Sequence, residues 1–269
     1  MDAELFARFG ELESRHWWFV ARREIVLGVI ASHVQSGARL LDVGCGTGFF
    51  LDRARESYST AGVDPSSIAL AMCERRRLED VKQGSATDLS SLHGERFDLV
   101  TLLDVIEHVD DDISALQAAR ATLVPGGHIV VTVPAFQFLW TAHDDLNHHR
   151  RRYTKHRLRT ALEASGFDVV HITYFNCYLF PLAFLERIGK RLLRLDGGPD
   201  LSLPPTLLNR AMRVIFGAER QRLEKGRSFP VGLSVLAVGR VSADIPDSTT
   251  MPAYATDGRS SPGAGRGNE

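Results

Sequence analysis

The chain has 269 residues, a length that suits one α/β domain with insertions or one domain plus a small subdomain. A formal net charge of −1 and 24% charged residues exclude an overall field that would draw the protein to nucleic acid or to an anionic membrane. The three cysteines form no CxxC or zinc spacing, and no apolar stretch resembles a secretory signal core or a membrane span, so we expect a cytoplasmic protein.

Residues 1–36 carry apolar side chains at helical spacing and predict an N-terminal helical cap. Beyond them, short apolar runs alternate with helical stretches, as in βαβ units with a parallel sheet. Runs such as HIVVTV are apolar on both faces, which is typical of strands that helices cover on both sides. Strands are expected at 39–43, 60–63, 99–103, 128–133, 168–173 and 234–241, and helices near 47–57, 66–77, 111–123 and 155–165.

The alternation breaks at residues 180–226, where two helices with no strand between them are expected before the last strand. In the segment 181–195, apolar residues recur on one face of a helix and basic residues on the other. Such a helix can lie on a membrane surface or cover an apolar ligand, and it can equally pack on its own domain. Residues 243–269 are rich in Pro, Gly, Ser and Thr and predict a disordered tail.

The most informative stretch is LLDVGCGTGFFL at 40–51, in which a buried strand runs into Gly44, Gly46 and Gly48 and then into a helix. Glycine is needed where the backbone takes a positive φ or approaches a ligand without a Cβ in the way. The following helix offers free amides and the positive end of its dipole. Open α/β sheets bind nucleotides at such a turn, although a tight turn with no ligand is the alternative.

Two acids narrow the choice of nucleotide. Asp64 ends the second expected strand, where a carboxylate can accept both hydrogens of a ribose diol. The glycines read GxGxG rather than the GxGxxG of pyrophosphate-binding loops, and Asp42 precedes them by two residues. A carboxylate there would repel a pyrophosphate but could support an ammonium group. These charges favour S-adenosylmethionine, which has an ammonium and a sulfonium but no phosphate, over NAD.

Four segments also occur in the order and spacing of a known family. LLDVGCGTG resembles the first motif of the class I S-adenosylmethionine-dependent methyltransferases, and GSATD at 84–88 resembles their adenine segment. FDLVTLLDVIEH at 97–108 resembles the fourth strand and its exit loop, and VPGGHIVV at 124–131 the turn into the fifth strand. The flanking residues resemble, less specifically, a bacterial subgroup that acts on small molecules and lipids.

This resemblance implies a fold and a domain organisation. The expected fold is α/β, with a Rossmann-like, seven-stranded, mostly parallel sheet sandwiched by helices and a helical insertion before the last strand. The methyltransferase domain would span 37–242, and the insertion at 180–226 would form a lid over the acceptor.

The resemblance also implies cofactor contacts. Gly44, Cys45 and Gly46 would line the methionine and ribose portions of S-adenosylmethionine. Asp42 would orient the methionine amino group, and Asp64 would hold the ribose diol.

The adenine and acceptor ends of the site follow from the same resemblance. Ala86, Thr87 and Asp88 would lie against the adenine, and Leu103 would offer its backbone carbonyl to the methionine ammonium. Asp104 would lie at the mouth of the acceptor site. Asp88 and Asp104 could instead cap the helices that follow them.

Two flanking segments carry further candidates. Trp17 and Trp18 would form an aromatic lid over the sulfonium, or would pack the N-terminal helix on the sheet. The segment 143–159, HDDLNHHRRRYTKHRLR, follows the fifth strand, and its spacing matches no compact metal site, so no metal is expected. This segment contains Arg151, Arg152 and Arg157. These arginines form either a solvated face or a clamp for a phosphate or carboxylate on the acceptor.

The reaction expected from these residues is O- or C-methylation of a small-molecule or lipid-like acceptor. A hydroxyl acceptor would need a general base, for which His108, Asp104 and His143 are the candidates, in that order. A nucleic-acid methyltransferase and a non-catalytic S-adenosylmethionine-binding module are the alternatives, and an NAD-dependent oxidoreductase comes last. A nucleic-acid partner is not favoured, no obligate protein partner is indicated, and contact with a membrane would run through 181–195.

Overall fold

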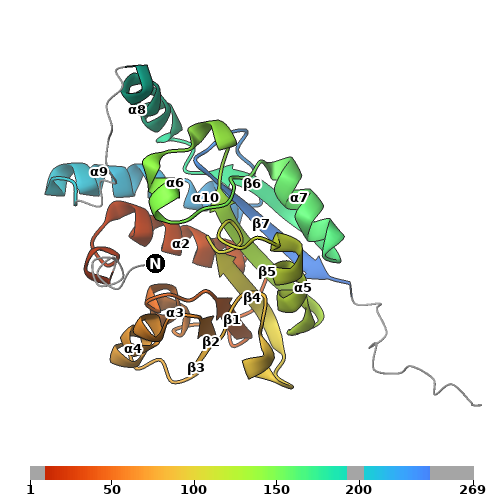
Figure 1. Cartoon of the computed structure of the whole chain (residues 1–269). Helices are drawn as coiled ribbons and strands as arrows, with labels where there is room; N and C mark the ends of the chain where they lie inside the picture. Colours follow the sequence, from red (N-terminus) through yellow and green to blue (C-terminus); the bar gives the residue numbers. More distant parts are fainter. Residues whose placement is uncertain (1–9, 193–202, 243–269) are drawn as a thin grey trace, which may run out of the picture.

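The computed structural model describes residues 10–192 and 203–242, which form a seven-stranded sheet in the order β3-β2-β1-β4-β5-β7-β6 (Figure 1). Of these strands, β7 alone runs antiparallel to its neighbours, β5 and β6. The expected Rossmann-like, mostly parallel sheet is confirmed. The strands are β1 (Arg39–Val43), β2 (Ser59–Asp64), β3 (Val81–Gln83), β4 (Phe97–Leu103), β5 (Leu123–Pro134), β6 (Phe167–Phe175) and β7 (Ser234–Val241).

Two strands differ from the sequence expectation. Strand β3 was not expected, because a three-residue edge strand with the sequence VKQ has too few residues to show a period. Strand β5 begins at Leu123, before the expected turn at Pro125–Gly127, and its pairing with β4 shifts register between Phe97 and Leu99. The Pro-Gly-Gly sequence is therefore accommodated inside an irregular start of the strand.

Helices cover both faces of the sheet. Figure 1 shows α5 and α7 on one side and α2, α3 and α4 on the other. Side-chain caps start several of them, with Ser66 accepting from the Ala69 amide at α4 and Asp111 from the Ser114 amide at α5. The helices are α2 (Trp17–Ala31), α3 (Phe49–Ala54), α4 (Ser67–Arg75), α5 (Asp112–Ala121), α6 (Ala142–Leu146), α7 (Lys155–Ala164), α8 (Phe180–Leu192), α9 (Thr206–Gly217) and α10 (Arg220–Glu224).

The N-terminal helix and the late insertion pack on one another. Helix α2 buries Ile25, Val29 and their apolar neighbours and contacts both α9 and α10. The insertion holds three helices in its described part rather than two, and the break before α10 is anchored by Glu219. This buried carboxylate accepts the backbone amides of residues 176, 177 and 178 at 2.7, 2.6 and 2.9 Å.

Some expectations fall outside the described residues. These are the first part of the N-terminal cap, the segment 193–202 and the tail 243–269. Within the described part of the chain, no helix combines the length and the apolarity that crossing a bilayer requires.

Candidate functional site

The glycine loop between β1 and α3 has the backbone that the sequence predicts. Gly44, Gly46 and Gly48 take φ values of 76°, 54° and 76°, which residues with a Cβ rarely adopt. A Cβ at Gly44 would lie 2.6 Å from Val105, and one at Gly48 would lie 2.4 Å from Leu78, so packing also requires these two glycines. A Cβ at Gly46 would meet no described atom within 4 Å, and the loop is therefore open to a ligand there.

Asp64 is joined to this loop. Its Oδ2 accepts the Gly46 amide and its Oδ1 accepts the Ser66 amide, both at 2.9 Å. Burial raises the pKa of Asp64, and the two hydrogen bonds act in the opposite direction. Because β1 and β2 are parallel neighbours, their carboxyl ends lie at the same sheet edge. The structure thus brings the loop and the acid together, as the sequence predicts.

Asp42 lies below the loop, inside the sheet. It is 2% exposed, and its Oδ1 accepts a hydrogen bond of 2.6 Å from Thr101 on the neighbouring strand β4. Burial raises the pKa of Asp42 to about 7. Because the pKa of this carboxyl is close to neutral pH, a nearby cation would hold Asp42 in its charged form. This suits the predicted role of Asp42 toward an ammonium group.

Asp104 follows Leu103, the last residue of β4, and is bound to the N-terminal helix. Its Oδ2 forms a 2.7 Å ion pair with Arg22 of α2, and its Oδ1 accepts from Thr132 at 3.0 Å. Arg22 also donates to Thr132 at 2.8 Å. Asp104 does not cap α5, whose N-cap is Asp111. Arg22 was not predicted at the site, because nothing in the local sequence links it to a strand end so far along the chain.

The segment expected at the adenine forms a tight turn. The backbones of Ser85 and Asp88 exchange hydrogen bonds of 3.2 and 3.1 Å around Ala86 and Thr87. The Asp88 carboxylate is exposed and accepts the Ser90 amide at 3.0 Å, which lowers the pKa of Asp88. The following 3-10 helix has Leu89 as its N-cap and no side-chain cap, so Asp88 does not cap it, and the Asp88 carboxylate remains open to solvent.

A second cluster lies at the exits of β4 and β5. Glu107 is fully buried, and neither of its carboxyl oxygens has a hydrogen-bond partner among the described residues. The His108 ring meets the His149 ring edge-on at 4.7 Å. Glu107, His108 and His149 each have one oxygen or ring nitrogen that could bind a metal ion, and these three atoms lie within 4.8 Å of one another. We call these three residues the carboxyl–imidazole cluster.

Burial decides the charge of this cluster. It raises the pKa of Glu107 well above its usual value, with a further increase from Asp104, and so favours the uncharged form of the carboxyl. It also lowers the pKa of His108 to about 4, with a further decrease from His149. A carboxyl and two imidazoles are ligands that a divalent cation such as zinc accepts.

His149 is held by a buried ion pair. Its Nδ1 lies 2.8 Å from Oδ1 of Asp144, which is fully buried. Arg152 binds the same carboxylate through two nitrogens, each at 2.8 Å, and Thr141 donates its amide. Burial opposes the charge on Asp144, but the bonds from His149 and Arg152 outweigh it and lower the pKa. Since Asp144 accepts at Nδ1, the ring nitrogen of His149 that remains for a proton is Nε2.

Two of the three arginines, Arg151 and Arg152, form neither the solvated face nor the anion clamp that the sequence left open. Arg152 is buried and bound to Asp144. Arg151 pairs with Asp112 at 3.2 Å and donates to the carbonyls of residues 109 and 110. Arg157 lies over the ring of Tyr153, 5.1 Å from its centre. Arg151 thus holds the loop after β5 against the loop after β4, where the Arg150 amide also donates to the Glu107 carbonyl at 2.7 Å.

The remaining candidates have mixed positions. The side chain of His143 lies outside the described residues. Trp17 packs edge-on against Phe216 of α9, and its amide donates to Asn209, which fits the packing interpretation. Trp18 lies beside Arg22, whose guanidinium is 5.1 Å from the ring centre and extends toward Asp104.

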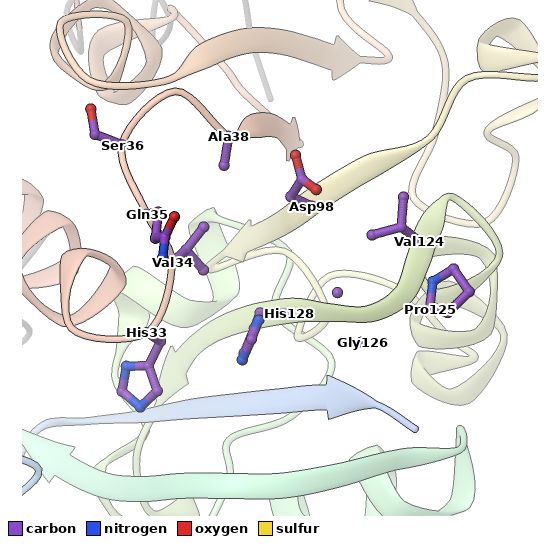
Figure 2. A pocket seen from close by; sticks show the side chains of 11 residues that line it. His33, Val34, Gln35, Ser36, Ala38, Asp98, Val124, Pro125, Gly126 and His128 are labelled. Carbon is purple, nitrogen blue, oxygen red and sulfur yellow. The ribbon is translucent and has the colours of Figure 1, made fainter. Parts of the chain in front are cut away.

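A separate cavity of about 380 Å³ lies at the opposite edge of the sheet (Figure 2). Its lining includes His33, Asp98 and His128, at the amino-terminal ends of the strands. We place the candidate site at the glycine loop instead, because ligands of open α/β sheets bind outside the carboxyl ends of the strands.

The fold is that of the class I methyltransferases. The chain superposes on the methyltransferase solved with the Trm112 activator of Haloferax volcanii, with a TM-score of 0.57, 19% identity and coverage of 89% of this chain and 95% of that one. An S-adenosylmethionine-dependent methyltransferase from Thermotoga maritima matches with a TM-score of 0.52 and 20% identity over 87% and 98% of the two chains.

The sequence comparison gives the family. The model of the methyltransferase domain matches residues 21–172, and the chain therefore belongs to this family. A ubiquinone biosynthesis O-methyltransferase of Cronobacter sakazakii is 31% identical over 145 residues, which cover 48% of this chain and 59% of that protein. The first curated relatives are thus matched over only 40% to 59% of their own length.

Proposed function

We propose that this chain is an S-adenosylmethionine-dependent methyltransferase that methylates an oxygen or carbon of a small, lipid-like acceptor. The observation that carries this proposal is the juxtaposition, at one sheet edge, of the Gly46–Asp64 pair and the exit of β4. The glycine loop supplies a binding site for a nucleoside, and the carboxyl–imidazole cluster beyond Asp104 supplies groups for proton transfer.

The residues present fit the proposed cofactor. Asp64 keeps a second lone pair on each oxygen for the two ribose hydroxyls. Asp42 and the Leu103 carbonyl would meet the methionine ammonium. Nε of Arg22 is buried without a hydrogen-bond acceptor in the described chain, so it is a donor that the methionine carboxylate would satisfy. Ala86, Thr87 and Asp88 would meet the adenine.

S-adenosylmethionine supplies an activated methyl group on its sulfonium, so the protein contributes mainly alignment and exclusion of water. Helix α2 closes one side of the proposed site through the Arg22–Asp104 ion pair. The loop after β5 closes another side through the Arg151–Asp112 pair, which joins it to the start of α5. Both contacts hold the acceptor groups in fixed positions relative to the glycine loop.

We assign the general base to His149, with Asp144 as its positioning residue. Asp104 is engaged by Arg22, and the pKa of about 4 makes His108 a weak base. A buried carboxylate that accepts from one imidazole nitrogen leaves the other free to take a proton, as in the catalytic triads. Replacement of His149 by Gln should lower kcat at least about 100-fold and leave S-adenosylmethionine binding unchanged.

An apolar region supports a lipid-like acceptor. Phe136, which follows β5, stacks on Tyr174 at 4.8 Å and on Phe138 at 5.2 Å. Phe138 meets Phe184 of α8 edge-on at 6.2 Å. This aromatic row joins the exit of β5 to helix α8, where Leu182 is 62% exposed. The relative from Cronobacter sakazakii is named as a ubiquinone biosynthesis O-methyltransferase. This name is consistent with an acceptor that carries an apolar chain.

The same surface leads us to propose peripheral contact with the cytoplasmic face of a membrane through 181–195. Leu182 and Leu185 of α8 are 62% and 66% exposed, and Leu207 and Val214 of α9 are 84% and 65% exposed. A nucleic-acid acceptor is less well supported, because the arginines that favoured it are bound to acids and carbonyls within the chain.

The test uses methyl-labelled S-adenosylmethionine, purified protein and a bacterial extract, with products divided into organic, aqueous and macromolecular fractions. We expect label in the organic fraction. Asp64→Ala should abolish labelling and weaken cofactor binding at least about tenfold, whereas Asp168→Asn, at an exposed position on β6, should retain both. Label confined to macromolecules, or cofactor binding unchanged in Asp64→Ala, would contradict the proposal.

A further inference from the structure

Three side chains that bind one another hold the second half of the glycine loop. Thr47, which follows Gly46, donates its hydroxyl to Oε2 of Glu13 at 2.5 Å. Arg76, the C-cap of α4, donates from Nε to the Thr47 carbonyl at 2.9 Å. The Arg76 guanidinium also pairs with Oε1 of Glu13. Each of the three residues is thus bonded to the other two, and Glu13 is the one that comes from the segment before α2.

Glu13 makes these bonds from a buried position. The residue is 5% exposed, and Thr47 is 7% exposed. Burial raises the pKa of Glu13, and the bonds from Thr47 and Arg76 act in the opposite direction. Burying an ion pair is often no more stabilising than packing apolar side chains of similar volume. Packing alone therefore does not require a carboxylate at this position, whereas directed bonds to the loop do.

The first half of the loop is held in another way. The amides of Gly44 and Cys45 donate to the same backbone carbonyl of β2, at 2.7 and 3.1 Å, and the Gly46 amide donates to Asp64. Gly46 itself has a φ of 54° and open space where a Cβ would stand, so its backbone is conformationally permissive. Bonds to Thr47, the next residue, restrict that freedom and so keep the Gly46 amide in place.

The same N-terminal element reaches the other end of the proposed cofactor site. Glu13 precedes α2, and Arg22 lies within α2, where it pairs with Asp104 at 2.7 Å. A Cβ placed on Gly10 would lie 2.5 Å from the side chain of Met72, so the segment also packs closely on α4. The N-terminal element therefore connects the glycine loop to the exit of β4.

We propose that Glu13 is a positioning residue of the cofactor site, which acts through Thr47 to hold the glycine loop in the conformation that binds S-adenosylmethionine. The inference rests on the proposed function, because it concerns the same nucleoside-binding loop. The segment before α2 is then part of the cofactor site rather than a separate cap on the sheet.

A positioning role has a defined effect on binding. Without the bond between Glu13 and Thr47, the loop spends part of its time in conformations that do not accept the nucleoside. The apparent affinity for the cofactor then falls in proportion to the fraction of loop that remains competent. A residue that served only to fold the chain would change the stability of the protein and leave the affinity of the folded form unaltered.

The experiment measures by calorimetry the Kd of the purified protein for S-adenosylhomocysteine, which carries the same nucleoside and amino-acid groups without the methyl. Glu13→Gln removes the charge, and Thr47→Val removes the hydroxyl at nearly constant volume. Each should weaken binding at least about tenfold, as expected when a hydrogen bond to a charged group is lost. Thr47→Ser, which keeps the hydroxyl, and Glu11→Gln, at an exposed carboxylate of the same segment, should retain the parent Kd.

A double-mutant cycle tests whether Glu13 and Thr47 act through one contact. If they do, the protein with both Glu13→Gln and Thr47→Val should bind only slightly more weakly than either single variant. Independent effects would instead multiply, to about 100-fold below the parent. A multiplied effect would overturn the inference.

Thermal melting of each variant separates positioning from folding. Arg76 keeps Asp52 of α3 as a partner at 3.6 Å when Glu13 is replaced, so we expect Glu13→Gln to fold. If it does not fold, the comparison of Thr47→Val with Thr47→Ser decides the question. An unchanged Kd in folded Glu13→Gln, or equal weakening in both Thr47 variants, would overturn the inference. Parent protein that fails to bind the ligand would instead overturn the proposed function, and with it the role of Glu13.

Discussion

Replacing Asp42 by Asn tests whether the buried charge of the proposed cofactor site destabilises the folded protein. The carboxyl is 2% exposed, and its pKa is raised by burial from 3.8 to about 7. Asparagine keeps an acceptor oxygen for the Thr101 hydroxyl, which lies 2.6 Å from Oδ1, and replaces the other carboxyl oxygen by an uncharged NH2 group. The variant should therefore fold like the parent and differ from it in its response to pH.

The sign follows from the raised pKa. A group whose pKa is higher in the folded state contributes stability fully below its unfolded pKa, near 3.8, and this contribution is lost as the pH rises through about 7. Asparagine does not ionise, so the Asp42→Asn variant does not lose this stability as the pH rises. Between pH 5 and pH 8, the free energy of unfolding of the variant should rise relative to the parent by about 3 kcal/mol.

Urea denaturation at both pH values, with Asp168→Asn as an exposed control, measures this difference. The same Asp42→Asn protein should bind S-adenosylmethionine at least about tenfold more weakly at pH 8, since the negative charge for the ammonium is gone. A stability difference that is equal at pH 5 and pH 8 would refute the assignment of a destabilising buried charge at this position.

Three further predictions concern the other parts of the proposed site. Asp144→Ala leaves the buried Arg152 with the Ala135 carbonyl but without a carboxylate partner and should lower the free energy of unfolding by about 3–5 kcal/mol, measured by urea denaturation. Dialysis against EDTA should leave methyl transfer intact, because His149 can take a proton without a cation; activity that is lost and then restored by a divalent cation would assign the carboxyl–imidazole cluster to a metal. Leu182→Gln combined with Leu185→Gln should reduce co-sedimentation with anionic vesicles at least about tenfold without changing cofactor affinity, and unchanged sedimentation would remove α8 from any membrane contact.

Local signals were sufficient for the sheet and the cofactor loop. The apolar runs predicted the central strands because a buried parallel strand must be apolar on both faces. Gly44, Gly46 and Gly48 predicted a loop with positive φ, and each of them has one. Asp64 was predicted beside the loop from its place at a strand end, and parallel pairing of β1 and β2 then brings it to Gly46.

The edge strand of the sheet and the short last helix of the insertion were less predictable from the sequence. Strand β3 has three residues and a single neighbour, so its apolar pattern is too short to detect. The third helix of the insertion, α10, has five residues and depends on Glu219 binding the backbone after β6. In both places a contact distant in sequence, rather than local propensity, decides the element.

The chemistry beyond the cofactor loop depended on the tertiary structure. The sequence by itself determined which acids, glycines and histidines end the parallel strands. Only the folded chain decided that Arg22 engages Asp104, that Arg152 is bound to Asp144 rather than open to an anion, and that burial lowers the pKa of His108, which led us to propose His149 as the base. The physical reason is that burial and pairing set the charge and freedom of each side chain, and both depend on loops that meet only when the sheet has formed.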